Sequence, residues 1–311
     1  AHCDQRRIDG SGDHAATALS AHFPDAEILI WRDVLIEGPV PGGISDEALA
    51  DVRARYIEQA FGMNGVREDF TRRDLAFERI TPADQVELWF ETDLHDQLQL
   101  IQILALFHAQ TTRPALSLTL DAPPLLKHIE EMAKKLAPVQ DAQLEEASVL
   151  WTAFRANDPS KVIALSNESG ALPEARAAFL RMLEEYPGAR DGLGRIERKA
   201  LLAVRDGAVA PALAFRHYQQ TEPLPFLGDL GFFSRLDALA FCKHPLLRGI
   251  PEGGITRASR EGKTLEYSHA EIGLTETGQA VLEERADFVK LNGIDRWIGG
   301  VNLNGPDVLR R

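Results

Sequence analysis

In the N-terminal part of the chain, short apolar runs alternate with segments whose apolar residues recur at helical spacing. The runs typical of buried strands are residues 27–31, 86–90 and 114–120. The helical segments are residues 15–23, 45–62 and 98–105. This order of helices and strands predicts right-handed crossovers and a Rossmann-like α/β domain with a mostly parallel sheet over residues 1–122.

The rest of the chain is largely helical in pattern. Residues 123–189 form amphipathic runs with little chemistry among them, so we expect a helical connecting region there. Residues 190–311 contain three predicted helices (194–205, 210–219 and 229–241), a predicted hairpin (264–267 with 271–274) and a closing helix capped by Thr275. Three helices, a two-stranded wing and a closing helix predict a winged-helix-like domain.

Ionisable residues follow two of the predicted strands at the points where these strands end. Glu91, Asp93, His95 and Asp96 come directly after the run 86–90, and Asp33 follows the run 27–31. In open α/β sheets, ligands bind beyond the carboxyl ends of the strands. We therefore expect a ligand site at this rim of the sheet.

Three of these acids are candidate metal ligands. Asp33, Glu91 and Asp93, brought to one rim, would hold Mg²⁺ or Mn²⁺ through oxygen ligands, and the metal would position a phosphate or activate a water. If the protein is an enzyme, Asp93 and His95 are the candidate catalytic residues, with His95 transferring a proton. In the alternative interpretation, Asp93 or Asp96 caps the helix that follows, and Asp33 accepts hydrogen bonds from the next turn.

Other residues near the predicted rim are ligand-binding candidates. Arg32 and Arg53 would neutralise a phosphate, and Gln97 would orient the ligand. Asp13 lies in Gly10-Ser11-Gly12-Asp13-His14-Ala15, which formally satisfies a dinucleotide-binding fingerprint. Because that fingerprint should follow an apolar strand and residues 5–8 are mostly polar, a simpler phosphate-binding turn at a helix start is an alternative.

Composition limits the class of protein. Of 311 residues, 44% are apolar and 26% are charged, which are ordinary values for a globular protein. The two cysteines lie far apart in sequence, which argues against a disulfide framework or a cysteine-rich metal site. No apolar stretch approaches the ~20 residues of a membrane span, and no signal-peptide pattern is present. We expect a soluble cytoplasmic protein with no membrane contact.

Charge is distributed unevenly along the chain. Residues 190–311 hold 17 basic and 16 acidic residues, a net charge of +1, whereas residues 1–189 hold 17 and 31, a net charge of −14. The acidic part would repel nucleic acid, but the C-terminal part can carry a local basic face. There, Ser234 and Arg235 of the predicted helix 229–241 are candidate DNA-reading residues, and the basic loop 257–263 is a candidate wing.

Several motifs occur together in both the N-terminal and the C-terminal parts of the chain. They are Gly12-Asp13, Trp31-Arg32-Asp33-Val34-Leu35, Glu37-Gly38-Pro39-Val40, Arg53-Ala54-Arg55, Leu88-Trp89-Phe90-Glu91 with Asp93 and Asp96-Gln97-Leu98, Pro225-Phe226-Leu227-Gly228-Asp229, Leu274-Thr275 with Gly278, and Arg296-Trp297-Ile298-Gly299-Gly300-Val301. On these residues the chain resembles the domain-of-unknown-function family number 1835. The resemblance implies no particular reaction. The chain departs from the family pattern near its start, where Arg7 stands about where a His is usual and His14 replaces a Ser.

The sequence leads to one leading function and two alternatives. The leading function is the binding of a small phosphorylated or nucleotide-like ligand at the rim of the α/β sheet. The first alternative is a metal-dependent phosphoester hydrolase that uses the same carboxylates. The second is a DNA-binding transcriptional regulator that acts through the C-terminal winged helix.

Overall fold

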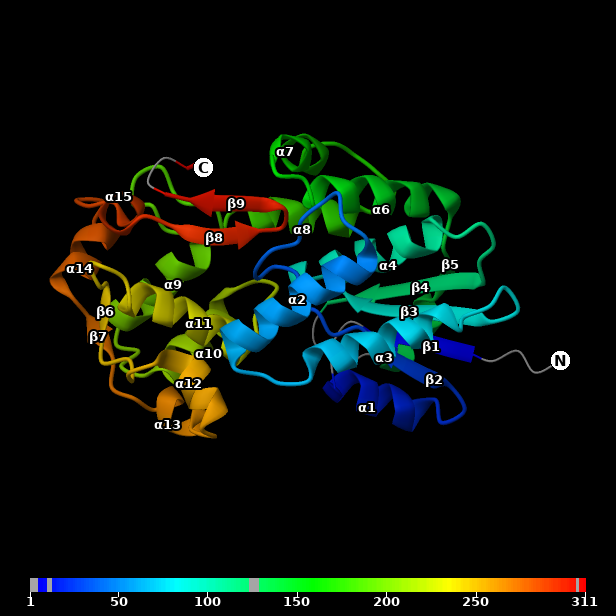
Figure 1. Cartoon of the computed structure of the whole chain (residues 1–311), viewed down its shortest axis with the longest axis horizontal. Helices are drawn as coiled ribbons and strands as arrows, with labels where there is room; N and C mark the ends of the chain where they lie inside the picture. Colours follow the sequence, from blue (N-terminus) through cyan, green and yellow to red (C-terminus); the bar gives the residue numbers. More distant parts are fainter. Residues whose placement is uncertain (1–4, 10–12, 123–128, 306–307) are drawn as a thin grey trace. The chain divides into compact units, whose positions relative to one another are not determined.

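The computed structural model describes residues 5–9, 13–122, 129–305 and 308–311 (Figure 1). The chain forms two packing units, each described separately below. The first comprises Ala1–Ile36, Val40–Asp51 and Arg67–Leu180, and the second comprises Glu37–Pro39, Val52–Val66 and Arg181–Arg311. Two of the boundaries therefore fall inside helices α2 (Asp46–Phe61) and α8 (Pro173–Leu183), and a third follows the first residue of α3 (Val66–Glu78). No helix in the described ranges combines the length and apolarity needed to cross a bilayer.

The first unit is built on a five-stranded sheet. In spatial order its strands are β2 (Glu27–Ile30), β1 (Gln5–Asp9), β3 (Gln85–Glu91), β4 (Ala115–Asp121) and β5 (Ala137–Pro138). The first four run parallel, and only β5 is antiparallel to its neighbour. The mixed α/β character and the mostly parallel sheet are thus as predicted. The order β2-β1-β3-β4 places the reversal of strand order between β1 and β3.

Strand β1 is a polar segment in a central position. Its residues Gln5–Asp9 pair with β2 on one side and with β3 on the other. The apolar pattern did not select this segment as a strand. Pairing on both edges satisfies the backbone groups of β1, and this ladder does not depend on side-chain type.

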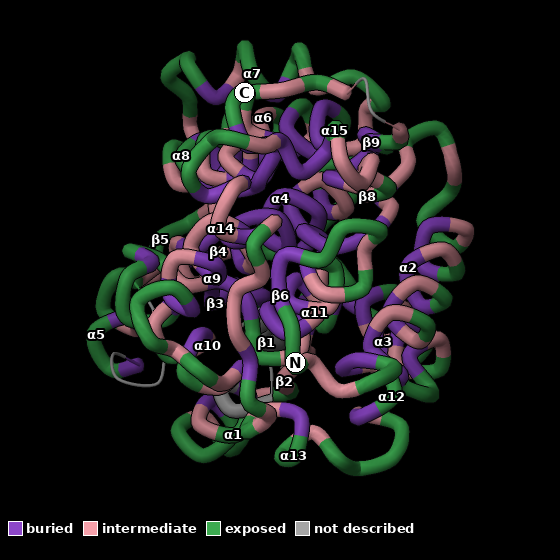
Figure 2. The backbone as a smooth tube through the Cα atoms, turned by 90° about the vertical axis from the view of Figure 1, so that its left-hand side faces the viewer, coloured by how far each residue is buried: buried purple, intermediate pink, exposed green. Residues whose placement is uncertain are grey.

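Both faces of β3 are covered. Trp89 packs with Leu19 of α1 (Asp13–His22) and with Ile129 and Met132 of α5 (Ile129–Lys135). Successive strand residues point to opposite faces. Leu88 and Phe90 therefore face the other side, and they too have no exposed surface. Figure 2 shows β3 and α4 (Leu94–His108) as buried along most of their length. Helix α4 packs closely against α6 (Asp141–Phe154).

The structure contains a helix, α3 (Val66–Glu78), that the sequence pattern did not reveal. Its buried stripe is Val66, Phe70, Arg73 and Phe77, at regular helical spacing. An arginine occupies one of the four inward positions, so the apolar period is interrupted. The Arg73 guanidinium lies over the rings of Trp31 (4.3 Å) and Phe70 (4.4 Å), an arrangement that a cation–π attraction stabilises.

The predicted helix start at Ser45 is confirmed by its cap. The Ser45 hydroxyl accepts a hydrogen bond from the Ala48 N–H at the start of α2. The pair Asp158-Pro159 predicts a second helix start with Asp158 as the N-cap. In α7 (Ser160–Ser166) the N-cap residue is Pro159 instead, although the Asp158 carboxylate does accept a hydrogen bond from the Ser160 N–H. These bonds satisfy N–H groups that have no partner inside the helix.

In the second unit, three helices match the prediction closely. They are α9 (Arg195–Arg205), α10 (Pro211–Thr221) and α11 (Asp229–Ala240). The cap of α14 (Glu276–Leu282) is also confirmed, because the Thr275 hydroxyl accepts from the Gly278 N–H at 3.0 Å. Local periodicity and capping chemistry were sufficient to predict these three helices and the start of α14.

The predicted hairpin 264–267 with 271–274 is wrong. Residues 264–268 form a helix, α13 (Thr264–Ser268), and β7 (Gly273–Leu274) pairs with β6 (Leu247–Arg248) instead. Most of the predicted basic wing loop is likewise a helix, α12 (Gly254–Arg260). The reason is a long-range anchor. The buried Tyr267 donates its hydroxyl to an Asp237 carboxylate oxygen (2.6 Å), which fixes α13 against α11.

The C-terminal part also contains elements that were not predicted. Helix α15 (Phe288–Asn292) is followed by the strands β8 (Asp295–Ile298) and β9 (Val301–Asn304), which form an antiparallel hairpin. Gly299, in the two-residue turn, has φ +57°, a conformation that favours glycine.

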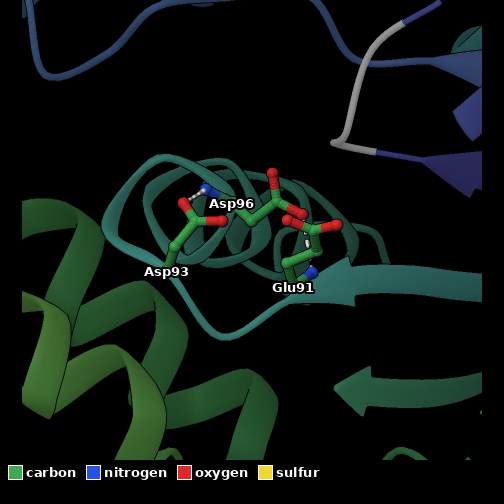
Figure 3. A group of neighbouring side chains, drawn as sticks. All are labelled: Glu91, Asp93 and Asp96. Atoms are coloured by element: carbon green, nitrogen blue, oxygen red, sulfur yellow. Dashed lines mark hydrogen bonds between the residues drawn. The ribbon is translucent and has the colours of Figure 1, made fainter. Parts of the chain in front are cut away.

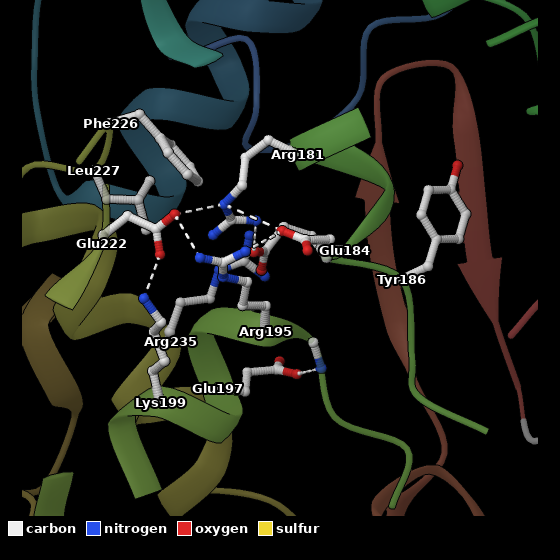
Figure 4. A network of polar contacts seen from close by, with 12 residues as sticks. Arg181, Glu184, Tyr186, Arg195, Glu197, Lys199, Glu222, Phe226, Leu227 and Arg235 are labelled. Atoms are coloured by element: carbon white, nitrogen blue, oxygen red, sulfur yellow. Dashed lines mark hydrogen bonds and ion pairs between the residues drawn. The ribbon is translucent and has the colours of Figure 1, made fainter. Parts of the chain in front are cut away.

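The interior of the second unit contains paired charges (Figure 4). The buried Glu222 carboxylate binds Arg181 Nε at 2.7 Å and Lys199 Nζ at 2.7 Å, and Arg195 approaches to 3.3 Å. Glu37 and Arg235, both nearly fully buried, form a second pair at 2.8 Å. Burial raises the pKa of Glu37, while the neighbouring Arg235 counteracts that shift. The buried carboxylates of Glu222 and Glu37 are thus each held by an opposite charge.

The Glu37–Arg235 pair gives a stability prediction. Arg235→Met alone leaves a buried carboxylate without its cation and is expected to cost ~3–5 kcal/mol, as is Glu37→Leu. The double variant removes both charges, so its loss should be clearly smaller than the sum of the two. Urea unfolding of the four proteins measures this coupling. Additive losses would show that the two residues do not stabilise one another.

Candidate functional site

The candidate site lies where β3 ends and α4 begins. Glu91 is the last residue of β3, and Asp93 is the N-cap residue of α4. The Asp93 Oδ1 atom accepts hydrogen bonds from the N–H groups of His95 (2.7 Å) and Asp96 (3.2 Å). The capping interpretation of Asp93 is therefore confirmed.

A second set of bonds ties the strand end to the first turn of the helix. The Asp96 Oδ2 atom accepts from the Glu91 N–H at 2.6 Å, and Gln97 Nε2 donates to the Glu91 carbonyl at 2.7 Å. Glu91, Asp93 and Asp96 thereby come together, as Figure 3 shows. One carboxylate oxygen from each lies within 4.8 Å of the others.

Burial dominates the electrostatics of this cluster. Asp93 is 4% exposed, and burial raises its pKa from 3.8 to about 7. The backbone N–H groups of Asp96 and His95 lower the pKa of Asp93, whereas the nearby Glu91 carboxylate raises it. The Asp93 carboxyl group therefore holds its proton to a higher pH than an exposed aspartate does, beside a second carboxyl group.

Such an arrangement supports two kinds of chemistry. Three carboxylates at this spacing offer the oxygen ligands that Mg²⁺ and Mn²⁺ prefer. A carboxyl group with a pKa near 7 can also accept or donate a proton at physiological pH. Gln97, whose Nε2 atom donates to the Glu91 carbonyl, has a buried side chain, and its Oε1 atom has no hydrogen-bond partner among the described residues.

Asp33 is not part of this group, although we predicted it as a metal ligand with Glu91 and Asp93. The structure instead brings Asp96 to them. The reason is strand order. Asp33 follows β2, and β1 lies between β2 and β3. Neighbouring strands are ~4.8 Å apart, so the ends of β2 and β3 are separated by about twice that distance.

Asp33 and Arg32, both predicted site residues, have other partners in the first unit. Asp33 is 3% exposed, and its backbone carbonyl accepts a hydrogen bond from Gln99 Nε2 at 2.8 Å. Arg32 forms an ion pair with Asp69 of α3 at 3.5 Å. Gln99, which sequence reasoning missed, also lies 3.0 Å from His95 Nε2. The only sequence feature that indicates a role for Gln99 is its position one helical turn after His95.

Arg53 has a structural role in the second unit, and the side chain of Asp13 lies outside the described residues. Arg53 belongs to the second unit and is fully buried. Its Nη1 atom donates to the carbonyl oxygens of Glu37 (2.6 Å) and Pro39 (3.2 Å), so it holds this turn in place. The backbone of Asp13 begins α1, but its side chain lies outside the described residues, as do residues 10–12 of the fingerprint.

The structure also shows that a candidate DNA-reading residue of α11 is buried. Arg235 of α11 is 5% exposed and is paired with Glu37. It therefore cannot reach a base edge without breaking a buried ion pair. This part of the DNA hypothesis is not supported by the placement of its main cation.

Comparison with known proteins assigns no relatives. No family model matches the chain, and no curated protein matches it.

The raised pKa of Asp93 predicts a pH dependence of stability. The unfolded chain loses this proton near pH 4, whereas the native state retains it up to about pH 7. The stabilisation is therefore fully present below about pH 4 and is lost as pH rises through about 7. Asp93→Asn keeps an oxygen that can cap the helix but does not titrate. The urea midpoint of this variant, minus that of wild type, should therefore increase from pH 5 to pH 8.

A matched control separates this effect from general acid removal. Glu68→Gln removes an exposed acid on α3 in the same unit and should retain the pH dependence of wild type. If the difference in urea midpoint between Asp93→Asn and wild type were the same at pH 5 and at pH 8, the raised pKa of Asp93 would be contradicted.

Proposed function

We propose that the first unit binds Mg²⁺ or Mn²⁺ through Glu91, Asp93 and Asp96, and through the metal a small phosphorylated or nucleotide-like ligand. The observation that carries this proposal is the convergence of three carboxylate oxygens within 4.8 Å at the end of β3. The buried Gln97 Oε1 atom is a second feature that fits an oxygen-liganded cation. A divalent cation would neutralise the cluster and recruit a phosphate to an otherwise acidic rim.

The strand order supports a ligand at this place. Doubly wound sheets with the order β2-β1-β3-β4 bind ligands outside the carboxyl ends, at the β1/β3 reversal. The acidic cluster follows β3 on that side of the reversal. We propose that the first unit is Rossmann-like in this functional sense, and that the chain is a member of the family it resembles.

The second unit would then act as a reader or partner-contact module. Its three helices, the β6–β7 pair and the closing helix α14 favour a winged-helix-like arrangement with α12 and α13 inserted between the paired strands. Contact with DNA through this module stays a prediction from the sequence.

A second candidate function is metal-dependent phosphoester hydrolysis at the same cluster. The observation that favours it is the pKa of Asp93, about 7, which suits proton transfer at neutral pH. His95, in the first turn of the same helix, is the second candidate proton-transfer group. A metal in this site would polarise the phosphoryl oxygen.

Metal binding is expected to depend on pH in a defined way. Because a metal ligand must be deprotonated, Mn²⁺ affinity should rise about tenfold per pH unit below pH 7 and level off above it. Calorimetric titration of the protein with Mn²⁺ between pH 5.5 and 8.5 measures this profile. Asp93→Asn and Asp96→Asn should each weaken binding at pH 8, whereas Glu68→Gln should not. Equal Mn²⁺ affinity in all four proteins would contradict the proposed site.

The hydrolase candidate has its own test. With Mn²⁺ present, wild type should release p-nitrophenol from bis(p-nitrophenyl) phosphate, and Asp93→Asn should lose this turnover while remaining folded, as measured by circular dichroism. Nucleotide-dependent thermal stabilisation without any turnover would favour ligand binding alone, since a ligand at 100 times its Kd adds ~2.7 kcal/mol.

A further inference from the structure

The second unit contains a cleft of about 1010 Å³, and all of its lining residues belong to that unit. One wall is a single stripe of α2 that runs from Val52 through Arg55 and Tyr56 to Gln59. A second wall is the face of α11 around Ser234, and the hairpin β8–β9 forms a third. The volume is ample for a metabolite or a short peptide.

The floor of the cleft is charged but internally neutralised. Arg235 is held by Glu37 at 2.8 Å, and Arg296 is held by Glu197 at 2.8 Å. The Glu37–Pro39 turn packs tightly against the cleft wall, because a Cβ atom on Gly38 (φ +76°) would lie 2.4 Å from the Tyr56 ring. These contacts fix the floor before any ligand arrives.

Two charges that line the cleft remain available. Arg55 on α2 and Asp295 on β8 are both exposed, and neither forms an ion pair with any residue that the structure describes. They have opposite signs and lie on different walls. A ligand that carries one anionic and one cationic group can therefore satisfy both, at lower desolvation cost than a ligand of single sign.

The overall charge of the lining supports the same ligand class. Its cations are matched in number by its anions, the set being Arg55, Arg235, Arg296, Glu37, Glu197 and Asp295. A nucleotide with several negative charges would require an excess of cations, which this lining does not offer. Aromatic surface is also available from Tyr56, Trp297 and Phe241, the last 54% exposed.

We propose that this cleft binds a zwitterionic ligand between an amino acid and a short peptide in size, with an apolar or aromatic side chain. Its carboxylate pairs with the Arg55 guanidinium, and its ammonium group pairs with the Asp295 carboxylate. The side chain packs on the aromatic surface. This site is separate from the carboxylate cluster of the first unit and does not depend on a metal there.

Calorimetry on the full chain tests the proposal with L-phenylalanine, the dipeptide phenylalanyl-phenylalanine and the doubly blocked N-acetyl-phenylalaninamide. At least one zwitterion should bind with a Kd below about 1 mM, and the blocked compound at least about tenfold more weakly. Arg55→Ala and Asp295→Asn should each weaken zwitterion binding about tenfold. Both residues are exposed, so the variants should keep the wild-type melting temperature.

Matched controls are present in the same unit. Arg216 on α10 and Glu252 are exposed, do not line the cleft and form no ion pair within the described ranges. Arg216→Ala and Glu252→Gln should leave zwitterion binding unchanged. The half-buried Cys242 lines the cleft, so the zwitterion should also slow alkylation of the Cys242 peptide, measured by mass spectrometry.

Four results would overturn the proposal. The first two are the absence of any zwitterion with a Kd below about 1 mM and an equal Kd for the blocked compound. The third is an equal loss of zwitterion affinity in the control variants. The fourth is that adenosine monophosphate binds more tightly than either zwitterion and protects the Cys242 peptide from alkylation.

Discussion

A charge removed from water must be paired or neutralised by a proton, and both units are organised around this constraint. In the second unit the buried carboxylates of Glu37 and Glu222 are held by cations. In the first unit Asp93 is stabilised by the N–H groups of α4 and, below about pH 7, by a proton. The two solutions have different consequences. A paired carboxylate fixes structure, whereas a carboxyl group that titrates near neutrality can exchange its proton for a metal ion.

The position of the acidic cluster follows from the sheet. Glu91 ends a strand that is buried on both faces, so this strand end is rigidly placed. The cap at Asp93 and the bond from the Glu91 N–H to Asp96 then orient the first turn of α4 against it. A capping role and a ligand role are compatible here, because a carboxylate has two oxygens and capping occupies one of them. The same residues thus shape the junction and supply its chemistry.

The cleft of the second unit differs in kind from this rim. Its floor consists of ion pairs that form without a ligand, such as Arg296 with Glu197, although Arg296 Nε has no hydrogen-bond partner among the described residues. Its specificity then depends on two exposed charges, Arg55 and Asp295, that come from segments far apart in the sequence. One protein can therefore hold a strongly acidic site in one unit and a charge-balanced site in the other.

Local chemistry was readable from the sequence, and long-range pairing was not. Periodicity and caps located α9 to α11 and the start of α14 at Thr275, because these depend on residues within a few positions of one another. The apolar runs located β3 and, with it, the region of the site. Helix α3 was hidden because Arg73 occupies an inward position, where its guanidinium lies over the Phe70 ring of the same helix and over the distant Trp31 ring.

The tertiary structure alone decided which of the predicted residues meet. Strand β1, too polar to be recognised, lies between β2 and β3 and so keeps Asp33 out of the cluster that Asp96 joins. Arg53 supports a turn of the second unit, and Arg55 lines a cleft there, although the two are neighbours in sequence. The sequence by itself determined the strongly periodic helices, the apolar strand β3 and the caps at Asp93 and Thr275, since capping bonds and periodicity act over short distances. Only the tertiary structure decided strand order and the partners of each charge, because these depend on contacts between segments that the sequence does not order in space.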